Sequence, residues 1–230
     1  MEIHFRKISE QWNRNVVQRA FELETRVDKS YYGHIVPKIQ QLLSMYSSNS
    51  DNVLDVGCGL GYLTSIIHST GRKITGIDIS SKSVAYAKEK FPELTFYHGS
   101  IEDYSLTSKK RFQVCIANMV LHNVTNFKSH IEAIDRTLCE SGLAIISIPH
   151  PFVWIKRFAR IDATLETKYD LPFQLSGQPA HISKITYHHR HVNTYLDLFS
   201  RIGWTKLEVI APALSNKESD LLFFVYKKSK

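Results

Sequence analysis

The sequence of 230 residues has few cysteines and no long hydrophobic run. Its three cysteines, Cys58, Cys115 and Cys139, form no C-x-x-C pair, which excludes a disulfide framework and is typical of unpaired thiols in a reducing compartment. No apolar segment approaches the roughly 18 residues that cross a bilayer, so a transmembrane protein is excluded. The first residues also lack the apolar stretch of a secretory signal. We therefore expect a cytoplasmic protein with no membrane partner.

The composition is that of an ordinary globular domain. Hydrophobic residues make up 43% of the chain and charged residues 22%, which excludes intrinsic disorder and is enough to build a sizeable core. The formal net charge is +7, from 29 Lys and Arg against 22 Asp and Glu. The basic residues are scattered and do not alternate with aromatic residues as on a base-stacking surface. A nucleic-acid partner therefore stays open but is not favoured.

Apolar strand patterns alternate with helical patterns along most of the chain. Alternation of this kind, without internal repeats, predicts a parallel sheet covered by helices. Strands are predicted over residues 53–56, 73–78, 94–97, 112–117, 143–148, 206–210 and 221–226. Residues 8–46 are predicted to be helical, with Pro37 in the first turn of a second helix, and further helices are predicted over residues 62–68, 83–91, 127–138 and 192–202. Gly142 is expected to end the helix over residues 127–138 as its C-cap glycine.

The fold class that follows is α/β, with a seven-stranded, mostly parallel, doubly wound sheet. The last strand is expected to run antiparallel, because the link before it is too short for a helical crossover. We interpret the chain as a single domain over residues 1–230, without a second domain. Its four segments are a helical lid (1–50), a ligand-binding core (51–148), an aromatic- and histidine-rich insertion over the binding edge (149–191), and a closing helix with strands (192–230).

A glycine-rich turn joins the first predicted strand to the helix that follows it. Its glycines are Gly57, Gly59 and Gly61, and Asp55 precedes them near the end of the strand. In an open parallel sheet this turn is where nucleotides bind, because glycine allows positive φ and a close approach of the backbone to the ligand. A dinucleotide fingerprint needs a third glycine at position 62, where this chain has Tyr62. The turn therefore departs from the dinucleotide fingerprint.

The segment Asp55-Val56-Gly57-Cys58-Gly59-Leu60-Gly61 resembles the D-x-G-x-G-x-G signature of class I, Rossmann-like methyltransferases of the small-molecule type. The resemblance implies S-adenosyl-L-methionine as the cofactor, and an acid near the glycines suits its ammonium and sulfonium groups. It also implies that Asp78 binds the ribose hydroxyls, and that Ser100 stands where the family has an acid beside the adenine amine. The cofactor-binding residues that it implies are Asp55, Gly57, Cys58, Gly59, Gly61, Asp78, Ile79, Ser100, Ile101, Glu102, Asn118 and Met119.

Motifs that are missing from the sequence exclude some classes of methyl acceptor. The segment Ala117-Asn118-Met119-Val120 is unlike the N-P-P-Y or D-P-P-Y of enzymes that methylate exocyclic base nitrogens. Asn118 also stands where catechol-type relatives have a magnesium-binding aspartate, and no metal site is predicted. What remains is methyl transfer to an oxygen or nitrogen of a small molecule. Two alternatives stay open: a tRNA- or protein-directed enzyme of the same fold, and a cofactor-binding but catalytically idle partner subunit.

The acceptor site is expected beyond the carboxyl ends of the strands. His122 and His189 are the catalytic candidates, because histidine can orient or deprotonate a nucleophile near neutral pH. For each of them, a hydrogen bond to nearby backbone without a catalytic role is the alternative. The residues expected to bind the acceptor are Tyr31, Tyr32, Trp154 and Tyr187. The identity of the acceptor and the oligomeric state do not follow from the sequence.

Overall fold

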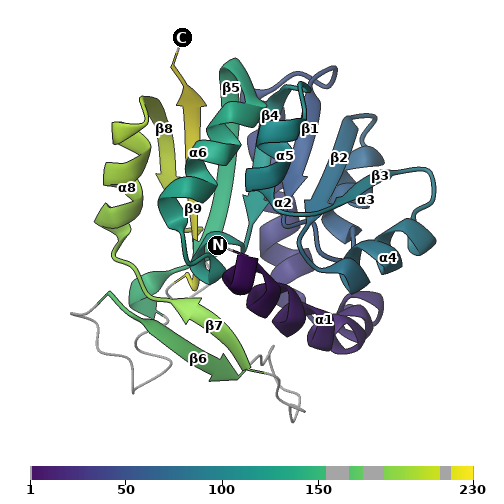
Figure 1. Cartoon of the computed structure of the whole chain (residues 1–230). Coiled ribbons are helices and arrows are strands. Elements are labelled where there is room, and N and C mark those ends of the chain that lie inside the picture. The colour runs from purple at the N-terminus through teal and green to yellow at the C-terminus, as the bar shows by residue number, and fades with distance from the viewer. Residues whose placement is uncertain (1, 154–165, 173–183, 213–218, 230) are drawn as a thin grey trace.

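The computed structural model describes residues 2–153, 166–172, 184–212 and 219–229, and these form a seven-stranded sheet flanked by helices (Figure 1). The strand order is β3-β2-β1-β4-β5-β9-β8. The strands are β1 (Asn52–Val56), β2 (Lys73–Asp78), β3 (Thr95–His98), β4 (Phe112–Asn118), β5 (Leu138–Pro149), β8 (Trp204–Ile210) and β9 (Leu221–Lys228). Strand β9 is antiparallel to both of its neighbours, and the other strands share one direction. The predicted fold class and the antiparallel last strand are confirmed.

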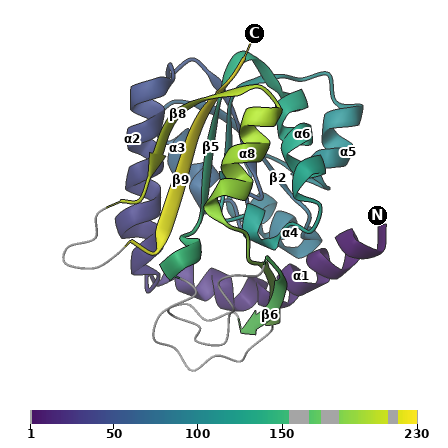
Figure 2. The same ribbon diagram turned by 90° about the vertical axis from the view of Figure 1, so that its left-hand side faces the viewer.

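Helices cover both faces of the sheet (Figure 2). One face carries α2 (Val36–Tyr46) and α3 (Tyr62–His68), and the other carries α5 (Ile101–Thr107), α6 (Phe127–Thr137) and α8 (Val192–Arg201). Helix α4 (Ser81–Lys90) packs against Phe96 of β3. None of the described helices is long and apolar enough to cross a membrane.

The strand sequences explain why both faces are covered. In β1, Val53 packs in the cluster that includes α2 and α3, whereas Leu54 packs in the cluster that includes α6 and α8. In β4, Val114 and Cys115 divide in the same way. Successive side chains of a strand point to opposite faces, so a run of apolar residues needs helices on both sides. With both faces covered, a ligand reaches the sheet at the ends of its strands.

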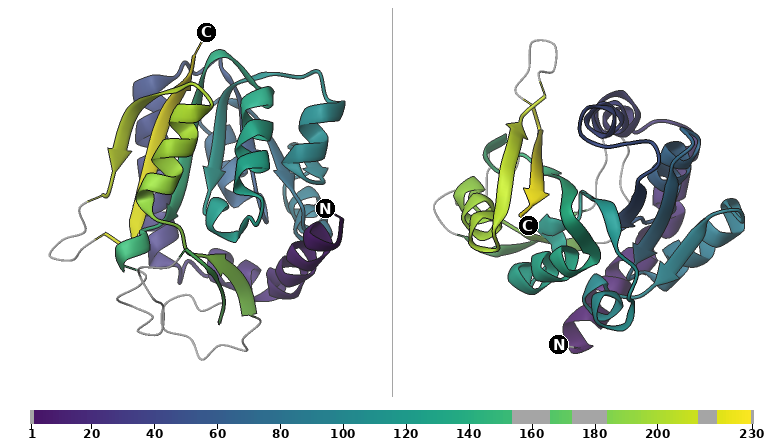
Figure 3. Two further views of the ribbon diagram at one scale, coloured as in Figure 1. Left: turned by 60° about the vertical axis from the view of Figure 1, so that its left-hand side comes forward. Right: turned by 90° about the horizontal axis from the view of Figure 1, so that it is seen from above.

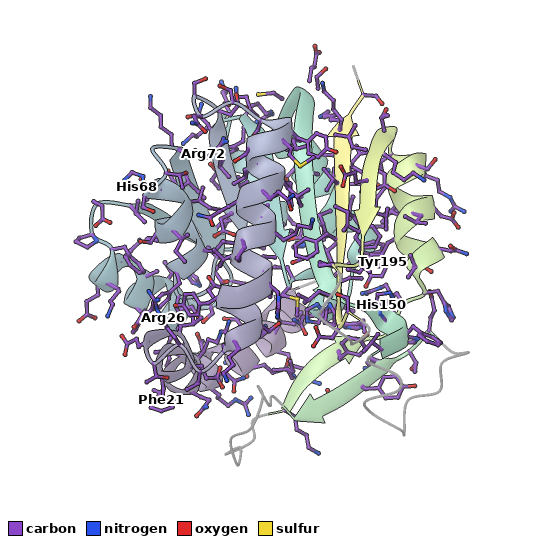
Figure 4. All side chains as sticks on the ribbon, turned by 180° about the vertical axis from the view of Figure 1, so that it is seen from behind. Phe21, Arg26, His68, Arg72, His150 and Tyr195 are labelled. Atoms are coloured by element: carbon purple, nitrogen blue, oxygen red, sulfur yellow. The ribbon has the colours of Figure 1, made fainter. Side chains whose placement is uncertain are left out.

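Helix α1 (Glu2–Glu24) runs beneath the carboxyl ends of the strands (Figures 1 and 3). Within the helical region predicted over residues 8–46, a turn and the π-helix Tyr31–Ile35 separate α1 from α2, and Pro37 lies in the first turn of α2 as predicted. The turn is held by Asp28, whose carboxylate accepts the backbone N–H of Tyr31 at 2.9 Å. Behind the sheet, Arg72 donates to the carbonyls of Leu43 and Ser48, which ties the end of α2 to the start of β2 (Figure 4).

Three local features differ from the prediction. The insertion contains a two-stranded antiparallel hairpin, β6 (Lys168–Pro172) and β7 (Lys184–His188), which the sequence pattern did not indicate. Helix α5 was also missed. The expectation for Gly142 was wrong, since α6 is capped by Leu138 and Gly142 lies inside β5, where an added Cβ would meet the Cys139 carbonyl oxygen at 2.9 Å.

Candidate functional site

A cavity of about 760 Å³ lies at the carboxyl edge of the sheet, between the loops that follow the strands and helix α1. Its wall is mostly apolar, and the charged groups in it are unbalanced. The described carboxylates that line it are those of Asp28, Asp55, Asp78, Glu102 and Asp220, whereas Arg19 is its one Lys or Arg among the described residues. That guanidinium is paired with Asp28 at 2.7 Å and with Glu22 at 3.3 Å. The cavity therefore favours a ligand that carries positive charge.

The glycine turn forms one wall of this cavity. Gly57 and Gly61 have φ of +71° and +80°, and a Cβ on them would meet Val120 at 2.3 Å and the Phe96 ring at 2.7 Å. These two glycines are needed for the packing of the turn itself. Gly59 differs, because its φ is +53° but nothing lies within 4 Å of an added Cβ. Its open side is the space that a ligand approaching the backbone would fill.

Asp78 ends β2 and holds the glycine turn. One of its carboxylate oxygens accepts the backbone N–H of Gly59 at 2.8 Å, and the other accepts that of Ser80 at 2.7 Å. The hydroxyl of Ser80, and not the carboxylate of Asp78, caps helix α4 by accepting from the Ser83 N–H. Burial raises the pKa of Asp78 above its ordinary value, against the two backbone hydrogen bonds that lower it. Each oxygen keeps lone-pair capacity for a further donor, such as a hydroxyl group.

Asp55 is almost fully buried behind the glycine turn. Its Oδ2 accepts the Thr64 hydroxyl at 2.7 Å, and its Oδ1 has no hydrogen-bond partner among the described residues. Burial is the main cause that raises its pKa from 3.8 to about 7. A buried carboxylate oxygen without a donor is costly, and a cationic or N–H-bearing ligand would satisfy it.

The loop after β3 carries two polar groups with different roles. Ser100 is the N-cap of α5: its hydroxyl accepts the Asp103 N–H at 3.0 Å and donates to the Asp103 carboxylate at 2.7 Å. Glu102 is buried and accepts from His130 Nδ1 of α6 at 3.0 Å. All three of Ser100, Glu102 and His130 line the cavity. Ile79 and Ile101 line it as apolar neighbours.

The end of β4 is tied to β5. Asn118 accepts the Ser147 hydroxyl at 2.6 Å, and the Met119 N–H donates to the Ser147 carbonyl at 2.9 Å. Met119 has a φ of +58°, which side-chain-bearing residues seldom adopt. Both residues line the cavity, as does Cys58.

His122 lies in a short 3₁₀-helix (Leu121–Asn123) after β4 and lines the cavity. Its Nε2 accepts from Asn123 Nδ2 at 3.1 Å, and its Nδ1 has no partner among the described residues. Burial lowers its pKa from 6.5 to about 3, and Arg190 and His188 add to the effect. The imidazole is therefore neutral at physiological pH, and the hydrogen bond that Nε2 accepts from Asn123 leaves the proton on Nδ1.

Of the other predicted acceptor-site residues, Tyr31 and Tyr187 lie in the cavity or beside His122, whereas Tyr32 and His189 do not line the cavity. Tyr31 lines the cavity, whereas the Tyr32 hydroxyl donates to the Leu23 carbonyl at 2.8 Å and lies outside it. Tyr187 packs behind His122, with ring centroids 5.8 Å apart. His189 borders a separate small pocket beside the hairpin and is not among the cavity residues. Trp154 lies outside the described residues.

Sequence reasoning missed several residues of this cavity. Arg19 and Asn15 come from α1, and His130 and Asn123 follow β4. The histidine could have been found from its position one turn into a helix that begins at the carboxyl end of a strand. The α1 residues carried no such signal, because the path of α1 across the sheet edge is set by tertiary contacts.

Comparison with known proteins identifies the family. A family described as "Methyltransferase domain" matches residues 47–203, which is more than half of the chain. The chain belongs to this family. This match confirms the prediction that the chain is a class I, S-adenosylmethionine-dependent methyltransferase, and it confirms the cofactor at the level of the family. Among the described residues, no group of three or more His, Cys, Asp or Glu side chains is placed to hold a metal ion.

Individual relatives of this methyltransferase domain are distant. The ubiquinone biosynthesis O-methyltransferase of Rickettsia akari is 30% identical over 148 residues, 62% of this chain and 57% of the relative. The malonyl-[acyl-carrier protein] O-methyltransferase of Pectobacterium atrosepticum is 25% identical over 115 residues, 50% of this chain and 45% of the relative. The chain thus spans about half the length of these curated relatives.

A solved structure supports the fold of the methyltransferase domain. An S-adenosylmethionine-dependent methyltransferase from Clostridium acetobutylicum aligns with a TM-score of 0.68 at 14% identity, over 94% of this chain and 99% of that one. At this identity the likeness concerns the fold alone. The residues of the cavity nevertheless fit the cofactor of the family. Gly59 leaves open space for a ligand beside the backbone. The lone pairs of Asp78 and the unpartnered oxygen of Asp55 can accept hydrogen bonds from N–H, O–H or cationic groups of a ligand.

Proposed function

We propose that this protein transfers the methyl group of S-adenosylmethionine to an oxygen or nitrogen of a small-molecule acceptor. The observation that carries the proposal is the acidic cavity between the glycine turn and α1. Five carboxylates against one paired guanidinium suit a sulfonium and an ammonium group, and they oppose the phosphates of a nucleic acid. A volume of about 760 Å³ lies in the usual range of small-molecule sites.

The residues around the glycine turn would hold the cofactor. Asp78 would accept from its ribose hydroxyls, and Gly59 would let the ligand lie against the backbone. The free Oδ1 of Asp55 would accept from the ammonium group. When bound, the cofactor supplies an electrophilic methyl group, so the protein contributes mainly orientation and exclusion of water.

The acceptor would lie beside Tyr31 and His122. Because the pKa of His122 is lowered to about 3, its imidazole is too weak a base to deprotonate an acceptor at neutral pH. Its Nδ1–H is instead placed to donate a hydrogen bond that orients an acceptor oxygen. Catalysis would then rest on positioning, and His189 has no part in it because it lies outside the cavity.

The position of α1 supports a small acceptor over a macromolecule. Helix α1 covers the carboxyl edge of the sheet, so the cavity is bounded on two sides, by α1 and by the strand ends (Figure 3). The relatives from Rickettsia akari and Pectobacterium atrosepticum are both named O-methyltransferases, which favours oxygen as the methylated atom. We further propose a cytoplasmic location and the four-segment single domain described above.

The proposal is tested by two measurements on the purified protein. Calorimetry with S-adenosylhomocysteine should show stoichiometric binding. Incubation with methyl-labelled S-adenosylmethionine and panels of phenols, carboxylic acids and amines should yield a labelled small product, whereas bulk tRNA should stay unlabelled. Label in tRNA alone would refute the small-molecule assignment. Binding without product from any panel would favour the catalytically idle partner subunit, and absence of binding would refute the proposal altogether.

A further inference from the structure

Glu102 and His130 form a buried pair that the proposed reaction does not use. Glu102 Oε1 and His130 Nδ1 are 3.0 Å apart, and the side chains are only 8% and 10% exposed. Both residues line the cavity. The second ring nitrogen of the histidine, Nε2, is fully buried and has no hydrogen-bond partner among the described residues. A buried, unpartnered nitrogen in the wall of a ligand cavity needs a ligand atom to satisfy it.

The pair fixes which ring nitrogen of His130 carries the proton. An ionised carboxylate only accepts hydrogen bonds, so His130 Nδ1 must carry the proton that it shares with Glu102. Burial opposes the ionisation of Glu102, but the hydrogen bond that it accepts from His130, with help from Arg136, holds its pKa below the ordinary value. In the neutral imidazole, Nε2 then has a free lone pair. The wall therefore presents an acceptor here, and it calls for an N–H or O–H donor.

The surroundings of His130 narrow the kind of donor. The only other polar side chain at the start of α5 that lines the cavity, Ser100, uses its hydroxyl both to accept from and to donate to Asp103. Ile79 and Ile101 provide apolar surface in the same cavity, after β2 and β3. An acceptor nitrogen in a cavity with apolar surface suits a flat heterocycle that bears an N–H group at its edge. Of the parts of S-adenosylmethionine, only adenine has this character.

We infer that His130 Nε2 accepts a hydrogen bond from the exocyclic amino group of the cofactor's adenine. This inference rests on the proposed function. Glu102 is the positioning residue, because it holds the histidine in the tautomer that accepts. His130 would thus bind the amine, whereas the hydroxyl of Ser100 is used in hydrogen bonds to Asp103 at the N-terminus of α5. The methyltransferase would distinguish a 6-aminopurine cofactor from a 6-oxopurine one through this pair.

The test compares two ligands that differ at the relevant atom, S-adenosylhomocysteine and S-inosylhomocysteine, by calorimetry at pH 8. The 6-oxo group of inosine is an acceptor and would face the acceptor Nε2. The wild-type protein should therefore bind the adenosyl ligand roughly 10- to 100-fold more tightly, as expected for one unmatched buried hydrogen bond. In His130→Ala this preference should fall to within about threefold. The exposed His34 gives a matched control, since His34→Ala should keep the full preference.

A second variant separates recognition from a structural role. In Glu102→Gln the amide can donate to His130 Nδ1, which moves the imidazole proton to Nε2 and makes it a donor toward the cavity. The preference for the adenosyl ligand should fall or reverse, although the histidine is still present. An unchanged preference in both His130→Ala and Glu102→Gln, in proteins whose melting temperatures show that they are folded, would overturn the inference. Failure of the wild-type protein to bind S-adenosylhomocysteine would instead refute the proposed function.

Discussion

Asp78→Ala should weaken binding of S-adenosylhomocysteine far more than it weakens the fold. The carboxylate accepts backbone N–H groups of Gly59 and Ser80 and keeps lone-pair capacity on each oxygen. If a ribose diol donates to both oxygens, the substitution removes two charge-assisted hydrogen bonds of about 1.5–3 kcal/mol each. The total of about 3–6 kcal/mol corresponds to a loss of affinity of roughly 150- to 25,000-fold. If only one hydroxyl donates, the loss is about 10- to 150-fold.

The effect on stability should be smaller. Removing Asp78 leaves two backbone N–H groups without their acceptor, but it also removes a buried charge whose raised pKa shows that its ionised form is disfavoured. These effects oppose each other, so we expect a destabilisation of about 1–3 kcal/mol. The fold should remain intact at 25 °C.

Calorimetry and thermal unfolding on the same preparations separate the two effects. Asp78→Asn keeps the size of the side chain but loses its charge, and it should give an intermediate loss of affinity. Glu89→Ala, an exposed acid near the end of α4, is the control and should bind like the wild type. A folded Asp78→Ala protein whose affinity stays within threefold of the wild type would refute the assignment of Asp78 to the ribose.

Three further predictions follow from the geometry of the cavity and the core. Gly59→Val should reduce the affinity for S-adenosylhomocysteine at least about 100-fold in calorimetry, because its side chain enters the open side of the turn. Gly71→Val, which also has a positive φ and open space but lies outside the cavity, controls for backbone strain and should bind normally. Ionisation of Asp55 near its pKa of about 7 should make the affinity for S-adenosylmethionine rise between pH 6 and 8. Because its folded pKa lies above the unfolded value, the same group stabilises the ligand-free fold at low pH and loses this contribution as the pH rises from about 4 through 7. A pH dependence of affinity that persists in Asp55→Asn would contradict this cause. Burial raises the pKa of the Cys115 thiol, so maleimide should label the half-buried Cys139 before Cys115. If mass spectrometry finds the label on Cys115 in the folded protein, the packing of the core is not as described.

Short stretches of sequence were sufficient to predict most of the helices and strands. The helix predicted over residues 62–68 coincides with α3, and the strand over 73–78 coincides with β2. Helix α5 had a readable signal that was overlooked, since Ser100 is followed three residues later by Asp103, whose N–H it caps. Gly142 shows the opposite error. Its position after a helix pattern indicated a C-cap, but pairing with neighbouring strands extended β5 through it.

The glycine turn was predictable because its constraints are local. Gly57, Gly59 and Gly61 lie within one turn next to Asp55, and each has a positive φ, which by itself favours glycine at these three positions. Asp78 was predictable for a related reason, since parallel strands that alternate with helices bring their carboxyl ends to the same edge. The sequence by itself thus determined the fold class and the family, and it located the glycine turn and Asp78 at the carboxyl ends of the strands.

The tertiary structure decided which of the histidines face the cavity. His130 meets Glu102 across 28 residues, from helices on one face of the sheet, and His189, equally plausible by sequence, is held beside the hairpin instead. The hairpin and α1 are joined by a hydrogen bond between Gln11 and Thr186, 175 residues apart. Contacts of this range depend on how whole elements pack, and no local pattern of apolar or polar residues encodes them. The positions of these histidines therefore depend on how whole elements pack, whereas the glycine turn follows from local backbone geometry.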